Sequence, residues 1–560
     1  MTPSAQPSSA QTPSTQFTAG ITPDAPRSDL PGRLAALATD LQAVGYTVDG
    51  VAALLGGAAH TALGRDQLIP ALIVTEAAAQ GEPTTAALAA VVRLWLLAEP
   101  QSSKTLDAAL PGIRTEGLLE LGLVEASAEG LVQAKADLRP YGWDGEGAGD
   151  AAAGEETGSG GADLWVASDL AAHQRPGILR HDHVLGIGQA STTLVQVTAR
   201  RHVARALDLG TGCGIQTFHL LHHADHVTAT DISERALAFT RFNLLLNAAE
   251  LHVDPADLEN RVSLRLGSLL EPVAGEEFEL VVSNPPFVIT PRSLDEAVTD
   301  QFTYRDGGLA GDDIVASLVR ALPSVLAPGG TAQLLGNWEI AAGTSWAERP
   351  QSWASPDTDA WFIQREQVGP EQYAETWLQD ASENRDRRLY QVSYAAYLDD
   401  FASRNVEGIG FGMIWLRRPA AGTGPVLSRF EEITYPIEQP VGPNLGAAVE
   451  RADWLAANDL EAAHLLVAED VTEERHQRPG AEHPGVILLR QGAGLRRTNL
   501  LSTELAGFVS ACDGDLSAGQ IIGALEALLG GYEGFDAGAF RSGLLAEVGN
   551  LVRDGFLLPA

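Results

Sequence analysis

The feature that most constrains this chain of 560 residues is a short apolar run that leads into a glycine loop. The run Ala206–Leu209 is followed by glycines at alternate positions, Gly210, Gly212 and Gly214. Glycine permits the positive φ values of a tight turn and leaves no Cβ between the backbone and a bound ligand. A helix is expected over Ile215–His222. The order strand, glycine loop, helix predicts an open α/β sheet with a ligand at the carboxyl ends of its strands.

Two carboxylates lie close to this loop in the sequence. Asp208 stands at the end of the first predicted strand, and Asp231 at the end of the second, Val227–Asp231. A carboxylate at the tip of the second strand can accept hydrogen bonds from both hydroxyls of a ribose, as in dinucleotide-binding folds. The loop, however, has the spacing Asp-x-Gly-x-Gly-x-Gly, whereas dinucleotide binders have Gly-x-Gly-x-x-Gly. The spacing therefore argues against a dinucleotide.

A second motif follows the buried run Leu280–Val282 and consists of Asn284, Pro285, Pro286 and Phe287. Such a position, at the carboxyl end of a strand, is where ligands of open α/β sheets bind. The simpler interpretation is a Pro-Pro turn that ends the strand. The Asn284 side-chain oxygen and the Pro285 carbonyl can instead accept both N–H bonds of a planar amine and aim its lone pair. Phe287 can stack on that planar group.

Together, the glycine loop, the acid at Asp231 and the Asn-Pro-Pro-Phe motif resemble class I S-adenosylmethionine (SAM) methyltransferases of the branch that methylates planar nitrogens. Enzymes that methylate adenine N6, guanine N2 of ribosomal RNA, or the glutamine of release factors share an Asn-Pro-Pro-aromatic motif. The resemblance implies a Rossmann-like, doubly wound α/β core, SAM as cofactor, and N-methylation without a metal. It covers about Leu164–Arg418, under half of the chain.

The resemblance also implies which residues contact SAM. Asp208 would meet the methionine ammonium, Asp231 the ribose, and Ile232 the adenine. Ser268 stands where many relatives have an acid that touches the adenine amine, and its hydroxyl can still donate or accept there. The implied cofactor residues are Asp208, Gly210, Thr211, Gly212, Gly214, Asp231, Ile232, Ser268 and Asn284.

The segment before the glycine loop allows two interpretations. A helix is expected over Thr192–Arg200, capped by Ser191 or Thr192. In related methyltransferases this segment closes over the cofactor, but an ordinary loop-to-helix connection fits equally well. After the loop, four histidines at helical spacing are explained better by a surface helix face than by a metal site; they are His219, His222, His223 and His226.

Composition and charge narrow the choice of partners. A net charge of −36 repels nucleic acid at long range, because binding to phosphate depends on Lys and Arg contacts, and so favours a protein or a small metabolite as acceptor. The only cysteines, Cys213 and Cys512, provide neither a disulfide framework nor a cysteine zinc site. No apolar run approaches the roughly 20 residues of a membrane span, and the N-terminus lacks the pattern of a signal peptide. We therefore expect a cytoplasmic protein without a membrane partner.

The domain organisation follows from shifts in composition and periodicity. We expect a disordered tail (1–28), a helical winged-helix-like domain (29–142), an acidic glycine-rich linker (143–163), the methyltransferase domain (164–418), and an α+β domain that ends in a winged-helix-like module (419–560). Winged helices often bind nucleic acid, but the first module has few basic residues and can equally serve packing or protein binding.

These observations lead to an expected function. We expect a SAM-dependent methyltransferase that acts on an rRNA base or on a glutamine or asparagine side chain of a translation protein. One alternative is a small-molecule N-methyltransferase. Another is a non-catalytic binding protein that keeps the fold, although the presence of both Asp231 and Asn284 argues against it.

Overall fold

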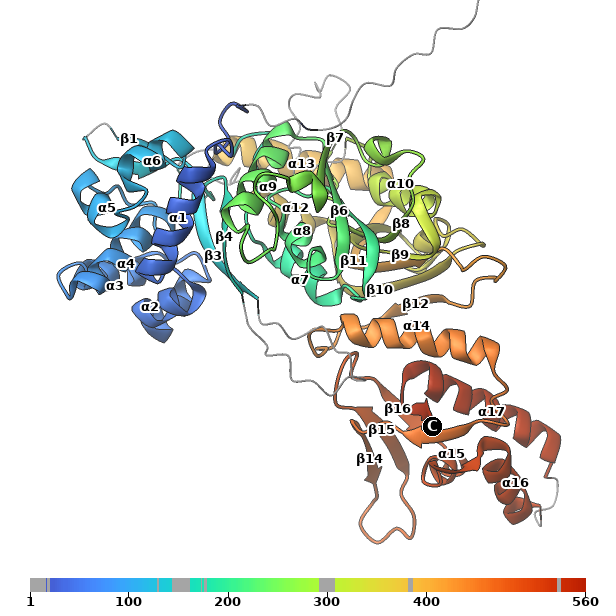
Figure 1. Ribbon diagram of the computed structural model, residues 1–560. Helices are drawn as coiled ribbons and strands as arrows, with labels where there is room; N and C mark the ends of the chain where they lie inside the picture. Colours follow the sequence, from blue (N-terminus) through green and yellow to red (C-terminus); the bar gives the residue numbers. More distant parts are fainter. Residues whose placement is uncertain are drawn as a thin grey trace, which may run out of the picture.

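The computed structural model describes residues 17, 21–127, 130–143, 162–172, 174–175, 179–291, 308–380, 386–530 and 535–560. Its centre is an eight-stranded sheet in the order β12-β10-β11-β9-β8-β5-β6-β7 (Figure 1). The strands are β5 (Val203–Leu209), β6 (Ala224–Asp231), β7 (Val262–Leu266), β8 (Phe278–Ser283), β9 (Leu326–Ala341), β10 (Asp359–Val368), β11 (Val406–Arg417) and β12 (Ser428–Glu432).

The sheet is mixed, with a parallel half and a partly antiparallel half. β7, β6, β5, β8 and β9 run parallel to one another, whereas β11 is antiparallel to both β9 and β10. The strand order reverses between β5 and β8, so the chain passes outward in both directions from this pair. The crevice at the carboxyl ends of two such strands is where open α/β sheets bind ligands. The predicted doubly wound α/β core is confirmed.

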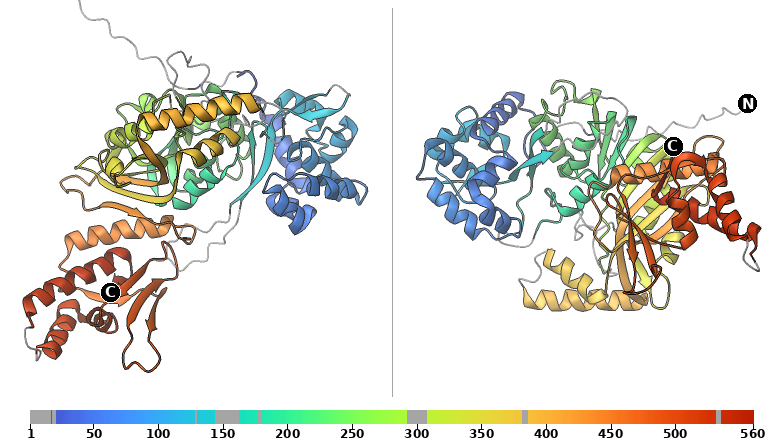
Figure 2. Two further views of the ribbon diagram at one scale, coloured as in Figure 1. Left: turned by 180° about the vertical axis from the view of Figure 1, so that it is seen from behind. Right: turned by 90° about the horizontal axis from the view of Figure 1, so that it is seen from below.

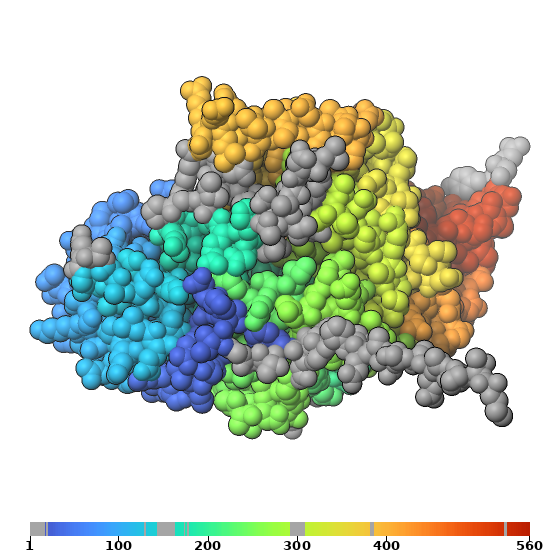
Figure 3. Space-filling view, turned by 90° about the horizontal axis from the view of Figure 1, so that it is seen from above, coloured from blue at the N-terminus to red at the C-terminus, as the bar shows by residue number. Residues whose placement is uncertain are grey.

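Helices cover both faces of the sheet, which explains why apolar residues of its parallel strands are buried on both sides. Ala206 and Val282 belong to the apolar core that includes α7, α8 and α9, whereas Leu207 and Val281 belong to the core under α10. A helical insertion between β10 and β11 consists of α12 and α13, which project side by side from the central region (Figures 2 and 3). The elements of this part are α7 (Gln189–Val197), α8 (Ile215–Leu220), α9 (Glu234–Leu246), η1 (Leu258–Asn260), η2 (Glu271–Val273), α10 (Asp313–Ala321), η4 (Leu322–Val325), α11 (Glu348–Gln351), α12 (Pro370–Asp380) and α13 (Arg387–Ser403).

The N-terminal region is helical and ends with a helix followed by two short antiparallel strands. Its elements are α1 (Pro31–Val44), α2 (Val48–Leu63), α3 (Ile69–Ala78), α4 (Pro83–Trp95), α5 (Ser103–Ala109), α6 (Arg114–Leu121), β1 (Val124–Ala126) and β2 (Val132–Ala134). One continuous apolar core runs from Leu34 of α1 through Trp95 of α4 to Val203 of β5. The N-terminal region and the central sheet therefore share a core.

Three of the predicted boundaries are wrong. The linker bounds 143–163 overlap an antiparallel ribbon, because β3 ends at Trp143 and β4 begins at Ala162; residues 144–161 lie outside the described residues. The tail does not extend to residue 28, because the backbone N–H of Arg27 donates to the carbonyl of Leu121 at 2.8 Å. β12 pairs with β10, so the central sheet continues beyond residue 418. The ribbon strands are β3 (Asp137–Trp143) and β4 (Ala162–Ser168).

The C-terminal region lies at the opposite end of the molecule from the N-terminal helices (Figure 2). It contains two small three-stranded sheets, β14-β15-β16 and β17-β13-β18, and a separate apolar core. Its elements are α14 (Gly442–Ala457), β13 (His464–Val467), β14 (Val471–His476), β15 (Val486–Gln491), β16 (Thr498–Leu501), α15 (Thr503–Val509), β17 (Asp513–Ser517), α16 (Ala518–Leu529), α17 (Ala537–Asp554) and β18 (Leu557–Pro559). Within the described part of the chain, every helix is too short or too polar to cross a membrane.

Candidate active site

The glycine loop lies between β5 and α8 and has the conformation that its glycines predict. The φ values of Gly210, Gly212 and Gly214 are 78°, 58° and 96°, in the region that side chains rarely adopt. The N–H groups of Gly210 and Thr211 both donate to the carbonyl of Thr230 at 2.9 Å, which fixes the loop against the end of β6. The loop is thus held beside the second predicted site strand.

Asp208 lies beneath this loop and is 1% exposed. Its Oδ2 accepts hydrogen bonds from the hydroxyls of Thr211 at 2.8 Å and Thr217 at 2.7 Å. Burial raises the pKa of Asp208 to about 6, although the two threonines oppose this shift. Within the described residues, Oδ1 has no hydrogen-bond partner. A cationic ligand group at this oxygen would offset the desolvation of the carboxylate.

Asp231 joins the glycine loop to the start of α9. Its Oδ2 accepts the N–H of Gly212 at 3.0 Å, and its Oδ1 accepts the N–H of Ser233 at 2.8 Å. Burial raises the pKa of this carboxyl as well. Each oxygen keeps lone pairs for a further donor such as a ribose hydroxyl.

Two further predicted cofactor residues, Ile232 and Ser268, lie beside Asp231. Ile232 is 59% exposed, which is unusual for a large apolar side chain and leaves a flat surface beside the carboxylate. The N–H of Gly267 donates to the carbonyl of Asp231 at 3.0 Å, so the turn after β7 that carries the half-buried Ser268 lies at the same place. The structure therefore brings the predicted cofactor residues together around the ends of β5, β6 and β7.

The Asn-Pro-Pro-Phe motif follows β8, the strand beside β5. The hydroxyl of Ser283 donates to the carbonyl of Leu209 at 2.7 Å, which places Asn284 next to the glycine loop. Asn284 Oδ1 is buried and has no hydrogen-bond partner among the described residues. An unpaired buried carbonyl oxygen costs about 1–3 kcal/mol, so it is a point at which a ligand N–H would be stabilising.

The rest of the motif forms a tight turn. The N–H of Phe287 donates to the carbonyl of Pro285 at 2.8 Å, so one of the two lone pairs of this predicted acceptor is already used. Pro286 and Phe287 are half-buried, and the Phe287 ring packs against the apolar cores of both faces of the sheet. A planar substrate would therefore meet only the part of the ring that stays exposed.

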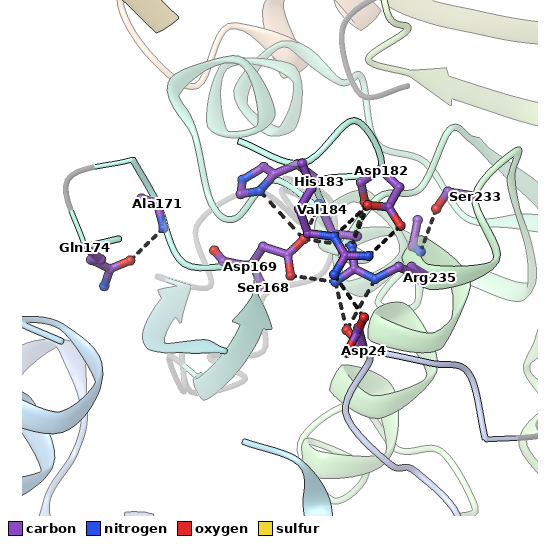
Figure 4. Close-up of polar contacts among 12 residues, drawn as sticks. Asp24, Ser168, Asp169, Ala171, Gln174, Asp182, His183, Val184, Ser233 and Arg235 are labelled. Carbon is purple, nitrogen blue, oxygen red and sulfur yellow. Dashed lines mark hydrogen bonds and ion pairs between the residues drawn. The ribbon is translucent and has the colours of Figure 1, made fainter. Parts of the chain in front are cut away.

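Arg235, in the first turn of α9, was not a sequence candidate, yet it braces this site (Figure 4). It is 6% exposed and forms two hydrogen bonds with Asp169, at 2.7 and 2.9 Å. It also donates to the carbonyls of Asp24 at 2.8 Å and Asp182 at 2.6 Å. One guanidinium thus joins the N-terminal segment and the segment before α7 to the helix that follows Asp231. Residues so far apart in the sequence give no local signal.

The segment before the glycine loop is held differently from the prediction. α7 begins at Gln189 after Gly188 and has no side-chain cap, so the expected cap by Ser191 or Thr192 is wrong. The carbonyl of Ser191 instead accepts a hydrogen bond from the Gln216 side chain at 2.9 Å. This bond holds α7 against α8, the helix of the glycine loop.

The four histidines do not form one helix face, because α8 ends at Leu220. His219 is 6% exposed and lies 2.7 Å from the Tyr141 hydroxyl, and its burial lowers its pKa to about 3. The predicted surface face is therefore wrong for His219, whereas His222 is exposed. No group of three or more metal-ligating side chains occurs in the described part of the chain.

Comparison with known families agrees with this geometry. Residues 169–305 match the family model described as "Methyltransferase small domain", and residues 43–135 match one described as "Domain of unknown function (DUF7059)". The central region is a class I, SAM-dependent methyltransferase domain with a Rossmann-like fold, which confirms the predicted resemblance and cofactor.

Several curated relatives align with this region. A ribosomal protein uL3 glutamine methyltransferase of Bradyrhizobium diazoefficiens is 30% identical over 32% of this chain and 54% of the relative. A release factor glutamine methyltransferase of Geobacter sulfurreducens is 33% identical over 27% of this chain and 50% of the relative. A ribosomal RNA small subunit methyltransferase C of Alcanivorax borkumensis is 25% identical over 31% of this chain and 44% of the relative. The chain spans about half the length of these relatives.

Proposed function

We propose that this protein transfers the methyl group of SAM to a planar nitrogen of its acceptor. The observation that carries the proposal is the buried Asn284 Oδ1, which has no partner among the described residues and lies beside the glycine loop. The position after β8 is next to the strand-order reversal, where ligands of such sheets bind. A strand-ending turn would give no reason for an orphaned side-chain oxygen at this point.

The residues of the cofactor half fit SAM. The carboxylates of Asp208 and Asp231 would hold its ammonium and ribose, the glycine loop its methionine part, and Ile232 and Ser268 its adenine. When bound, SAM supplies an electrophilic sulfonium methyl group. The free Oδ1 of Asp208 and the exposed face of Ile232 are the features of this chain that such a cationic nucleoside would satisfy.

The acceptor half orients the nucleophile. A planar amide or exocyclic amine is a weak nucleophile, because its lone pair is delocalised. Asn284 Oδ1 would accept one of its N–H bonds and aim the lone pair, and Phe287 would stack on the plane. No strong base is required, because the proton is lost after methyl transfer.

The acceptor that we favour is a glutamine side chain of a translation protein. Two of the relatives above are named glutamine methyltransferases, and the net charge of −36 disfavours bare nucleic acid. The relative named for ribosomal RNA supports an rRNA base as the second candidate. The N- and C-terminal regions would then recognise the acceptor, since neither contributes to the cofactor residues.

Methyl transfer from labelled SAM into fractionated cell lysate tests the proposal. We expect the label to enter a fraction in which protease, but not nuclease, releases it. Release by nuclease alone would favour the rRNA base. Absence of transfer to every fraction, from protein that binds SAM, would contradict the proposed activity.

A further inference from the structure

β9 carries a buried asparagine beyond the point where the Asn-Pro-Pro-Phe motif begins. Ser283, the last residue of β8, pairs with Leu334, so Asn284 comes level with Leu335. Side chains alternate along a strand, and Asn337 therefore lies on the same face as Leu335, two residues further out. Asn337 is 0% exposed. Its position is at the carboxyl edge of the sheet, on the side of the Asn284 side chain.

Tyr373 of α12 links this asparagine to the loop that follows the motif. Its hydroxyl accepts the N–H of Ile289 at 2.8 Å and the Nδ2–H of Asn337 at 3.1 Å. The two bonds use both acceptor positions of the hydroxyl. Tyr373 is fully buried in an apolar cluster with Tyr397, Phe401 and Ile289. Through the Tyr373 hydroxyl oxygen, the α12–α13 insertion thus binds both the loop after the motif and the end of β9.

In this arrangement the two ends of the Asn337 amide point in different directions. Because Nδ2 is directed at Tyr373, Oδ1 points elsewhere, and it has no hydrogen-bond partner among the described residues. Asn284 Oδ1 and Thr290 Oγ1, on the same loop, are buried and without a partner in that part of the chain too. If Asn337 served only to connect β9 to α12, the desolvation cost of its buried Oδ1 would not be offset by a hydrogen bond.

We propose, on the basis of the proposed function, that Asn337 contacts the methyl acceptor, with Oδ1 accepting one N–H of the target nitrogen beside Asn284 Oδ1. Two side-chain carbonyl oxygens at one site match a primary amide or amine, which has two N–H bonds, better than a hydroxyl or a secondary amine. Tyr373 acts through Asn337 and Ile289 and is a positioning residue. The α12–α13 insertion therefore shapes acceptor selection.

The variant Asn337→Ala tests this contact, and Gln333→Ala is a matched control. Gln333 lies on the same face of β9, is 3% exposed, and also makes one side-chain hydrogen bond, from the N–H of Ala199 at 2.7 Å. The labelled-SAM assay with the active lysate fraction gives kcat/KM, calorimetry gives the SAM Kd, and thermal denaturation gives Tm. We expect Asn337→Ala to lower kcat/KM about 10- to 100-fold with a SAM Kd within about twofold of wild type. Gln333→Ala should lower Tm at least as much but keep kcat/KM within about threefold.

A second variant keeps the test decisive if Asn337→Ala does not fold. Tyr373→Phe removes only the shared hydroxyl and should lower kcat/KM without changing the SAM Kd. Either variant at the wild-type kcat/KM, while Asn284→Ala shows its expected loss of about 100-fold, would overturn the role of Asn337 and leave the proposed function intact. A wild-type protein that transfers no methyl to any fraction would overturn both.

Discussion

The cofactor half and the acceptor half of the proposed site differ in how far their buried polar side chains are hydrogen-bonded within the protein. In the cofactor half, both oxygens of Asp231 accept backbone N–H groups and Oδ2 of Asp208 accepts two threonine hydroxyls. Oδ1 of Asp208 is an exception, because it has no partner among the described residues. In the acceptor half, the carbonyl oxygens of Asn284 and Asn337 have no partner among the described residues. The first half is organised by the chain itself, before any ligand binds. Under the proposed function, the second half keeps its hydrogen-bonding capacity for a ligand, at the expense of stability.

The largest effect is expected from Asp231→Ala, which tests the organised half. It removes the two hydrogen bonds proposed for the ribose and also releases the N–H groups of Gly212 and Ser233. We expect SAM affinity to fall by about 3 kcal/mol, or roughly 150-fold, by calorimetry. Asp225→Ala, at the exposed start of the same strand, is the control and should leave the Kd unchanged. Unchanged affinity in Asp231→Ala would remove this carboxylate from the site.

Asn284→Ala probes the unpaired half. We expect methyl transfer to fall by about 100-fold, because an interaction that aligns the nitrogen near the transition state is lost. SAM affinity should stay nearly unchanged, in contrast to Asp231→Ala. Asn284→Asp keeps an acceptor oxygen and should retain more activity than alanine in the same labelled-SAM assay. Wild-type turnover by Asn284→Ala would show that the motif is only a strand-ending turn.

The third prediction concerns Asp208 in the cofactor half and the pH dependence of the free energy of unfolding. Burial raises the folded-state pKa of Asp208 to about 6, so the folded protein holds the carboxyl proton more tightly than the unfolded chain does. The stability that this proton binding contributes is fully present below the unfolded-state pKa near 3.8 and is lost as pH rises through 6. Asp208→Asn keeps an acceptor for both threonines and removes this titration. In the absence of ligand we expect it to raise the free energy of unfolding by about 2 kcal/mol at pH 7.5 and by much less at pH 4. Urea denaturation at both pH values measures this, and an equal effect at the two would contradict it.

Phe287→Ala should have the smallest effect. Loss of the stacking face should raise the KM for the acceptor about 10-fold and leave kcat and SAM affinity almost unchanged. Phe287→Tyr keeps the ring and is the control in the same steady-state kinetics. A lower kcat at constant KM would instead mean that the ring acts through the packing of its half-buried side against the two cores.

The same contrast explains what the sequence could predict. Gly210–Gly214 and Asp231 act through turn geometry and strand ends, which are local properties, and their arrangement was predictable. Tyr373 reaches Ile289 across 84 positions, and Arg235 reaches Asp169 across 66, so neither contact has a local pattern. β12 was assigned to the wrong domain for the same reason, because a strand's partner depends on the whole sheet.

The shared core of the N-terminal helices and the central sheet has a consequence for cooperativity. Leu34 and Trp95 lie in one apolar cluster with Val203 and Leu237. The N-terminal helices therefore cannot unfold without exposing apolar residues of the central region to water. The C-terminal region has its own cluster around Phe508 and Val552 and can open by itself. Heating should therefore reveal two units that meet near α14. The N-terminal helices should unfold together with the central sheet and not as a separate unit.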